Sequence, residues 1–236
     1  MFEKTISRLR QQFKDLADPE RAAQEKRYLK SPFKFYGVSV PKIRAVARQF
    51  KQENRGVSKE ALWDICQALW QGEFHEERAL AMVLLEEHQT LLDYSDMPSL
   101  ERMLQESTNW DQVDQISVHL VGAVLRKDQQ ALEYLKGWSR DPKFWMRRAA
   151  LLSQLLLFRE GKGDRGLFYS FADEMMEEKE FFIRKAIGWV LRDMSRVDPE
   201  EVFRFVAENR TRMSGVTLRE ATRRLPQHLR EQLTGR

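Results

Sequence analysis

The chain has 236 residues, of which 42% are hydrophobic, and its 40 Lys and Arg against 36 Asp and Glu give a net charge of +4. No window approaches the roughly 18 uncharged apolar residues of a membrane span, and the single cysteine, Cys66, excludes a disulfide framework and a cysteine-based zinc cluster. The N-terminus, Met1-Phe2-Glu3-Lys4, lacks the long apolar segment of a signal peptide, so we expect a cytoplasmic protein.

Helices are the elements that the sequence predicts along almost the whole chain. Apolar residues recur at spacings of three and four, as in Leu80, Val83 and Leu84, which is typical of amphipathic helices. Helix-start signals occur at Asp18-Pro19, Ser39-Val40-Pro41, Ser58, Asp141-Pro142 and Asp198-Pro199. Helix-end glycines follow at Gly56, Gly72, Gly137, Gly161 and Gly215. Together these signals predict about 12 to 14 helices and almost no strand.

A sequence block recurs about every 35 residues in segments with helical spacing. The clearest copy runs from Phe181 to Arg192, and diluted copies begin near His75, Trp110, Trp145 and Arg219. Self-similarity at this period is typical of stacked helix pairs, in which each pair buries its apolar face against its neighbours. We therefore expect one continuous repeat domain over residues 1–236.

Basic residues occupy equivalent faces of successive repeats. Because stacked repeats create one concave surface, these residues are expected to form a row, which would match the phosphate backbone of a nucleic acid. The alternative is that they lie along the edge of the repeat stack and pair with acidic neighbours, or that mixed charges merely solvate the helices. This basic row consists of Arg147, Arg148, Arg184, Lys185 and Arg192.

Trp110 and Asp114 stand one helical turn apart, where the other copies carry Arg, Lys or Ala. An aspartate inside a helix has little reason to be there unless its side chain is used, either in catalysis or in a salt bridge to the basic row. Trp110 and Trp189 are flanked by polar residues or by Gly188, so they could line a cleft, although tryptophans at helical spacing also fit a core. Asp111, three residues before Asp114, resembles the second member of a general acid/base pair, or it only favours the dipole at the helix start. We expect Asp114 to be the only carboxylate in this cleft.

The histidines give no sign of a metal site. Their positions show neither the HExxH pattern nor another metal-ligand spacing, so we expect no metal and no cofactor. The four are His75, His88, His119 and His228.

Three blocks in one order, Trp110–Asp114, Trp145–Ala150 and Phe181–Arg192, together with the N-terminal Arg27–Phe33, resemble the AlkD-like DNA alkylation-repair glycosylases. The resemblance extends over most of the chain, roughly from Phe13 to Arg224. It implies an all-α, right-handed solenoid of HEAT-like antiparallel helix pairs, with about six repeats. Such a solenoid would wrap duplex DNA in a basic concave channel, and we expect it to act as a monomer.

The same resemblance implies the release of cationic N3- or N7-alkylated purines from double-stranded DNA. Asp114 matches the catalytic carboxylate, Trp110 and Trp189 match the two indoles beside it, and Arg148 matches the active-site arginine. Asn109 departs from the family, some members of which carry an aromatic residue there. The expected DNA-binding residues are Tyr28, Phe181, Phe182 and Arg192, which match positions in the same cleft, and Arg147, Arg184 and Lys185 from the basic row.

One carboxylate is sufficient for this chemistry. Loss of a purine passes through an oxocarbenium-like sugar, which a nearby carboxylate stabilises while it orients the attacking water. Electron-rich indole faces stabilise the same cation. An alkylated purine is already positively charged, so it leaves without a protein acid, and no lysine nucleophile is needed for hydrolysis without strand cleavage.

Two alternatives belong to other functional classes. A non-catalytic HEAT-type scaffold could bind nucleic acid or protein through its concave face, but it would gain nothing from Asp114 inside a phosphate-binding groove. An RNA-binding helical repeat protein requires base-reading residues at fixed positions in each repeat, and the repeats differ too much there.

Overall fold

The computed structural model describes residues 2–234, and helices account for nearly all of its regular structure. Within this range the β-type pairing is limited to an isolated bridge between Lys34 and Phe74. The expected all-α class is therefore confirmed. The expected domain covers residues 1–236, of which Met1 and residues 235–236 lie outside the described range.

The helices follow one another with short connections along the chain. The first eight α-helices are α1 (Phe2–Asp15), α2 (Pro19–Leu29), α3 (Val40–Glu53), α4 (Lys59–Trp70), α5 (His75–Glu87), α6 (Met97–Glu106), α7 (Trp110–Asp114) and α8 (Gly122–Leu125). The remainder are α9 (Leu132–Trp138), α10 (Phe144–Leu152), α11 (Leu155–Arg159), α12 (Arg165–Glu174), α13 (Phe181–Met194), α14 (Pro199–Asn209), α15 (Gly215–Thr222) and α16 (Gln227–Thr234). Short 3-10 turns are η1 (Gln89–Leu91), η2 (Tyr94–Asp96) and η4 (Gln129–Ala131), and a π-helical segment, η3 (Gln115–Val121), joins α7 to α8.

Helix starts agree with several of the sequence signals. The carboxylate of Asp18 accepts a hydrogen bond from the backbone N–H of Arg21 at 3.0 Å, and Asp198 caps α14 in the same way. Ser58 accepts from Ala61 N–H at the start of α4. Each cap satisfies a backbone donor that has no partner inside its helix, a contribution of about 1 kcal/mol.

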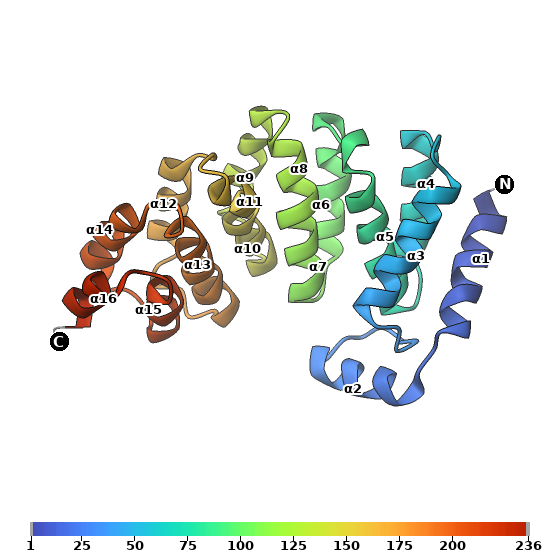
Figure 1. Cartoon of the computed structure of the whole chain (residues 1–236), viewed down its shortest axis with the longest axis horizontal. Helices are drawn as coiled ribbons and strands as arrows, with labels where there is room; N and C mark the ends of the chain where they lie inside the picture. The colour runs from blue at the N-terminus through green and yellow to red at the C-terminus, as the bar shows by residue number, and fades with distance from the viewer. Residues whose placement is uncertain (1, 235–236) are drawn as a thin grey trace.

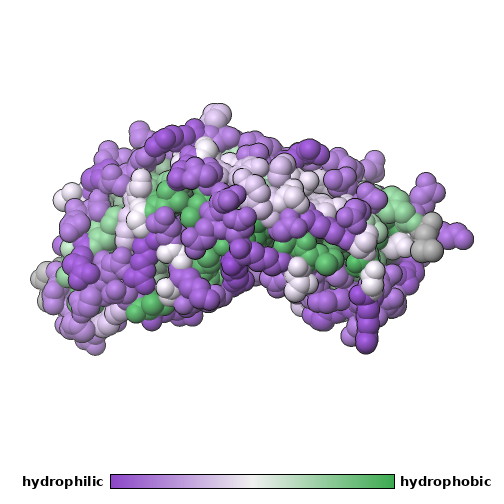
Figure 2. All heavy atoms as spheres, turned by 90° about the horizontal axis from the view of Figure 1, so that it is seen from above, coloured by the Kyte–Doolittle hydropathy of each residue, from purple (hydrophilic) through white to green (hydrophobic). Residues whose placement is uncertain are grey.

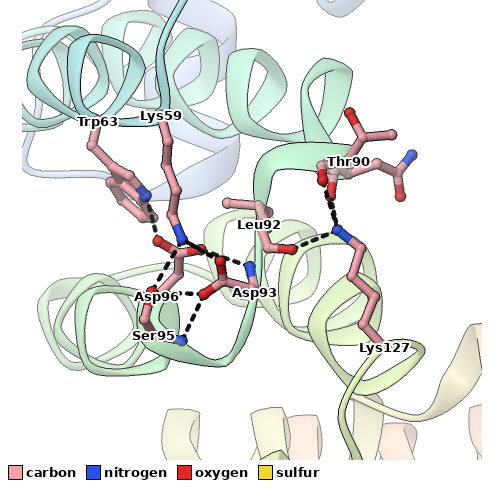
Figure 3. A network of polar contacts seen from close by, with 9 residues as sticks. Lys59, Trp63, Thr90, Leu92, Asp93, Ser95, Asp96 and Lys127 are labelled. Carbon is pink, nitrogen blue, oxygen red and sulfur yellow. Dashed lines mark hydrogen bonds and ion pairs between the residues drawn. The ribbon is translucent and has the colours of Figure 1, made fainter.

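The helices pack side by side in a curved row, with α2 lying apart below it (Figure 1). Contacts join residues about one repeat apart: Trp63 Nε1 donates to Asp96 at 2.7 Å, 33 residues away, and Lys59 contacts Asp93, 34 residues away (Figure 3). Trp138 Nε1 donates to Glu101 at 2.6 Å across 37 residues. Stacked helical repeats of about 35 residues predict such separations. The handedness and the number of the repeats stay predictions.

Lys127 shows how one helix pair closes the end of the previous one. Its ammonium donates to the backbone oxygens of Gln89, Thr90 and Leu92 at 2.6 to 3.0 Å (Figure 3). Carbonyls just beyond a helix C-terminus have no partner within the helix, so a cation placed there satisfies them and favours the helix dipole.

Apolar side chains fill the space between the helices along the whole row. Trp138 is buried, whereas Trp63 is half-buried and packs against the core. Cys66 is buried too, and burial raises the pKa of its thiol. The outer surface seen from above is largely hydrophilic and is hollowed near mid-length (Figure 2). Within residues 2–234 no helix has the length and apolarity needed to span a membrane, and the cytoplasmic location stays a prediction.

Candidate active site

Trp110 and Asp114 belong to one continuous helical segment, formed by α7, η3 and α8. Val113 and Ile116 have no exposed surface, whereas Trp110 and Asp114 are partly buried, so these two residues lie at the edge of the core. Immediately after Asp114 the helix widens to π-helical geometry, and Ser117 Oγ donates to Val113 O at 2.6 Å inside the widened turn. Segments of π-helix are rare and occur frequently at functional sites.

A cavity of about 380 Å³ opens beside this face. It brings together the two tryptophans and the aspartate that the sequence singled out, although Trp189 lies far along the chain in α13. Its lining combines apolar side chains from several helices with polar, charged and aromatic ones. The lining residues are Val40, Ile43, Arg44, Ala79, Met82, Val83, Trp110, Asp111, Asp114, Gln115, Val118, His119, Leu155, Arg159 and Trp189.

Arg148 holds the Asp114 carboxylate in a bidentate ion pair. Arg148 Nε and Nη2 donate to Asp114 Oδ1 and Oδ2 at 2.7 and 2.8 Å, and the remaining nitrogen, Nη1, donates to Phe182 O at 2.6 Å. The arginine side chain is 4% exposed and the aspartate 15%. Burial raises the pKa of Asp114, against the lowering effect of Arg148. The two sequence interpretations of Asp114 are thus compatible, because its side chain makes a salt bridge and also lines the cavity.

Trp189 is fixed by a carboxylate that sequence reasoning missed. Asp193, one turn later in α13 and 1% exposed, accepts a hydrogen bond from Trp189 Nε1 at 3.1 Å. It also accepts from Arg159 Nε and Nη2 at 2.9 and 2.6 Å. Asp193 follows Trp189 by four residues, and this i, i+4 spacing on a helix could have indicated the contact.

Gly188 permits a close helix contact behind Trp189. A Cβ at this position would lie 2.8 Å from Thr217 O and 2.6 Å from the Cβ of Glu220, both in α15. The absence of a side chain at Gly188 thus lets α15 approach α13 closely. This contact sets the position of α13 against α15.

Trp110 is flanked by Tyr28 and Asp111. The Tyr28 ring, 74% exposed at the end of α2, meets the Trp110 ring edge-on at 6.4 Å. Asp111 lines the cavity and lies 2.8 Å from His75 Nε2. The expectation that Asp114 would be the only carboxylate of the cleft is therefore wrong, because the first turn of α7 carries both aspartates to the same wall.

A polar cluster that the sequence did not reveal includes three residues of the cavity lining, Arg44, Gln115 and His119. Glu86 lies 3.0 Å from Arg44 and 3.3 Å from His119 Nδ1, and it accepts a hydrogen bond from Gln115 Nε2 at 2.7 Å. Burial lowers the pKa of His119, and Arg44 adds to this effect while Glu86 opposes it.

The remaining residues of the basic row lie outside the cavity; Arg147, Lys185 and Arg192 pair with acidic side chains, whereas Arg184 donates to a backbone carbonyl. Arg147 donates to both Glu178 oxygens at 2.8 Å, and Arg184 Nε donates to Glu178 O at 2.6 Å. Lys185 Nζ lies 3.6 Å from Glu220, which also pairs with Arg192. The alternative of acidic partners is thus confirmed for Arg147, Lys185 and Arg192 in the free protein but not for Arg184. Contact of the four residues with DNA stays a prediction.

The two phenylalanines have different environments. Phe182 is half-buried, with its ring 4.8 Å from that of Trp145 and 5.7 Å from the Arg148 guanidinium. Phe181 is 50% exposed, and its ring lies 5.9 Å from Lys185 Nζ. Phe182 therefore supports Arg148, whereas Phe181 is on the surface beside the basic row.

Comparison with known proteins gives a consistent result. Residues 9–225 match the family model described as DNA alkylation repair enzyme. A solved structure of a predicted DNA alkylation repair enzyme from Enterococcus faecalis is 27% identical, with a TM-score of 0.80, over 89% of this chain and 97% of that one. AlkD2 from Streptococcus mutans, 15% identical, shares the fold with a TM-score of 0.65 over 95% and 99% of the two chains. The curated proteins contain no significant match. Because the family model covers nearly the whole sequence, the chain belongs to the DNA alkylation repair enzyme family.

Proposed function

We propose that this protein is a monofunctional DNA glycosylase, which hydrolyses the N-glycosidic bond of cationic N3- and N7-alkylated purines in duplex DNA. The observation that carries the proposal is the Asp114 carboxylate, which lines the cavity together with the indoles of Trp110 and Trp189 and is held by the buried Arg148. Membership of a DNA alkylation repair family supports damaged DNA as the substrate.

Asp114 would act on the sugar. A carboxylate has about four lone-pair sites, and Arg148 occupies two of them, so two are left for a water and for the sugar. The C1′–N bond breaks with its electron pair going to the purine, which leaves as a neutral base. Asp114 stabilises the oxocarbenium-like sugar and accepts the proton of the water whose oxygen bonds to C1′. Because the ion pair holds its geometry before the reaction, this stabilisation requires little rearrangement.

The two indoles would stabilise the same positive charge. A cation over an indole face gains about 0.5 to 2 kcal/mol, with the larger value where water is excluded. Trp110 and Trp189 come from different helices and line one cavity, so a cationic nucleoside beside Asp114 would be within reach of both. Asp193 and Tyr28 keep the rings oriented before substrate binds.

The substrate range depends on the charge of the leaving base. Asp114 would assist the sugar but would not activate the leaving group, so the enzyme should release bases that already carry a positive charge. Neutral lesions such as uracil or 8-oxoguanine should be spared. Efficient excision of uracil from duplex DNA would contradict this mechanism.

The architecture proposed with this function is a right-handed solenoid of about six HEAT-like helix pairs, forming one domain over residues 1–236. The stacking contacts 33 to 37 residues apart support it. The active form proposed with it is a monomer.

The decisive experiment is incubation of the protein with duplex DNA that contains 7-methylguanine, with chromatographic detection of the free base. We expect release by the wild type and none from undamaged or uracil-containing duplexes. Binding of the methylated duplex without release would instead identify the non-catalytic scaffold and overturn the proposal.

A further inference from the structure

Helix α2 is weakly attached to the rest of the molecule. None of its residues is buried, and it lies apart from the row of helices (Figure 1). At its N-terminal end, Asp18 N–H donates to Tyr36 O at 2.9 Å. Because little apolar surface holds this helix, a small number of specific contacts decides its position.

At the other end of α2, one side chain from a distant segment makes a hydrogen bond. Asn109 Nδ2 donates to Leu29 O at 2.7 Å, across 80 residues of sequence. Leu29 is the last residue of α2, and the carbonyls at a helix C-terminus lack partners within the helix. The chain then turns away at Lys30, whose backbone is left-handed with φ of 49°. Asn109 therefore satisfies the end of α2.

Asn109 makes this bond instead of the one that its position favours. It is the residue before α7, where an asparagine normally accepts a hydrogen bond from a backbone N–H of the first turn, but its side chain makes no such cap. The side chain is 7% exposed and points to α2 instead. Since Trp110 is the next residue, the bond joins the helix of Asp114 directly to α2.

The position of Tyr28 depends on the same bond. Tyr28 precedes Leu29, and its ring meets Trp110 edge-on at 6.4 Å although it is 74% exposed. Between α2 and α7 lies a second cavity of about 230 Å³, whose lining includes Tyr28, Leu29, Trp110 and Asp111. Because this space separates the helices, side-chain packing alone does not fix α2 against Trp110.

We propose that Asn109 is a positioning residue that fixes the C-terminal end of α2, and with it Tyr28, against the Trp110 side of the active site. Asn109 does not touch the reacting atoms. Its effect on excision rests on the proposed function, whereas its effect on α2 does not.

The first test measures amide hydrogen exchange in α2. Asn109→Ser retains a residue that can cap α7 but is too short to reach Leu29 O. Loss of one such bond should speed exchange in α2 about three- to tenfold. The matched control is Asn209→Ser, which removes another buried asparagine that donates to a backbone oxygen, that of Phe205, at 3.0 Å in α14. This control should leave exchange in α2 unchanged.

The second test is single-turnover release of 7-methylguanine. Asn109→Ser should slow release about three- to tenfold in the wild-type background and have almost no further effect in a Tyr28→Ala background. Equal slowing in both backgrounds, or unchanged exchange in α2, would overturn the proposal. If circular dichroism shows that Asn109→Ser is unfolded, Asn109→Asp makes the same comparison, since it keeps the shape and the capping ability but loses the donor. A wild type that releases no base contradicts the proposed function, and the exchange experiment still decides the role of Asn109.

Discussion

Two arginine–aspartate pairs border the candidate active site with opposite orientations. In the pair of Asp114 and Arg148 the arginine is 4% exposed and the carboxylate lines the cavity. In the pair of Arg159 and Asp193 the carboxylate is 1% exposed and the arginine, at 37%, lines the same cavity. The partners are 34 residues apart in both cases, so each pair joins neighbouring repeats. One pair thus presents a negative group to the cavity and the other a positive group.

This difference shows how one type of contact can serve two purposes. Asp193 uses its oxygens on Arg159, Arg196 and the Trp189 indole, so it orients a ring and is not open to a ligand. For Asp114, Arg148 is the group that lowers the pKa, whereas burial raises it. A desolvated carboxylate with free lone pairs is costly for stability, and such costs concentrate at functional sites.

The largest expected effect is on Asp114. Asp114→Asn should lower single-turnover release of 7-methylguanine by about 100-fold or more, because the charge that stabilises the sugar cation is lost. Affinity for the duplex, measured by fluorescence anisotropy, should stay the same or rise, since a negative charge leaves a phosphate-binding surface. Unimpaired release would reduce Asp114 to a structural ion-pair residue.

The pH dependence of release should expose the same group. Asp114 must be ionised to act, and burial raises its pKa above the usual aspartate value. Activity should therefore fall as the pH decreases through this raised pKa, with about a tenfold loss for each further pH unit, after subtraction of spontaneous depurination. The acid limb should be absent from the residual activity of Asp114→Asn. An acid limb at the ordinary aspartate pKa or below it would contradict the desolvated environment.

The tryptophans should affect excision more than stability. Trp110→Ala and Trp189→Ala should each slow release by several-fold to about 30-fold, as expected for the loss of a cation–indole contact. Both indoles are only partly buried, so the free energy of unfolding should fall by less than the roughly 3 to 5 kcal/mol of a core tryptophan truncation. Chemical denaturation provides the measurement, and Trp138→Ala, in the core, is the matched control.

Asp193→Asn should lower stability more than excision, the reverse of what is expected for Asp114→Asn. The loss of charge-assisted hydrogen bonds to Arg159 should lower the free energy of unfolding by about 1.5 to 3 kcal/mol. Release of 7-methylguanine should slow by less than tenfold, because an asparagine oxygen can still accept from the Trp189 indole. A loss of activity as large as that of Asp114→Asn would mean that Asp193 takes part in the chemistry.

The smallest effects are expected on the basic row. Lys185→Ala should reduce the slope of log affinity against log salt by up to about one, because its side chain is 46% exposed and its ammonium comes no closer than 3.6 Å to Glu220. Arg147→Ala should change the slope less, since both Glu178 oxygens already hold this guanidinium. Equal slopes for the two variants would show that DNA displaces Glu178 from Arg147.

The sequence by itself determined the elements and the residues of interest. Apolar spacing and caps such as Asp18 and Asp198 predicted helices, since these signals act within a few residues of one chain segment. The repeat of about 35 residues predicted stacking, and the contacts between Trp63 and Asp96 have that separation. Asp114 was identifiable because it interrupts a regular repeat pattern with a residue that a helix interior does not favour.

Only the tertiary structure decided which side chains meet. Arg147 and Arg148 are adjacent in sequence and look equivalent, yet one pairs with Glu178 outside the cavity and the other with Asp114 beside it. The choice depends on which helix face meets the next repeat, because the two side chains point about 100° apart around α10. Local spacing cannot reveal this for partners more than 30 residues away. The carboxylates of Asp193 and Asp111 became part of the site for the same physical reason: the packing of α13 and α7 around one cavity.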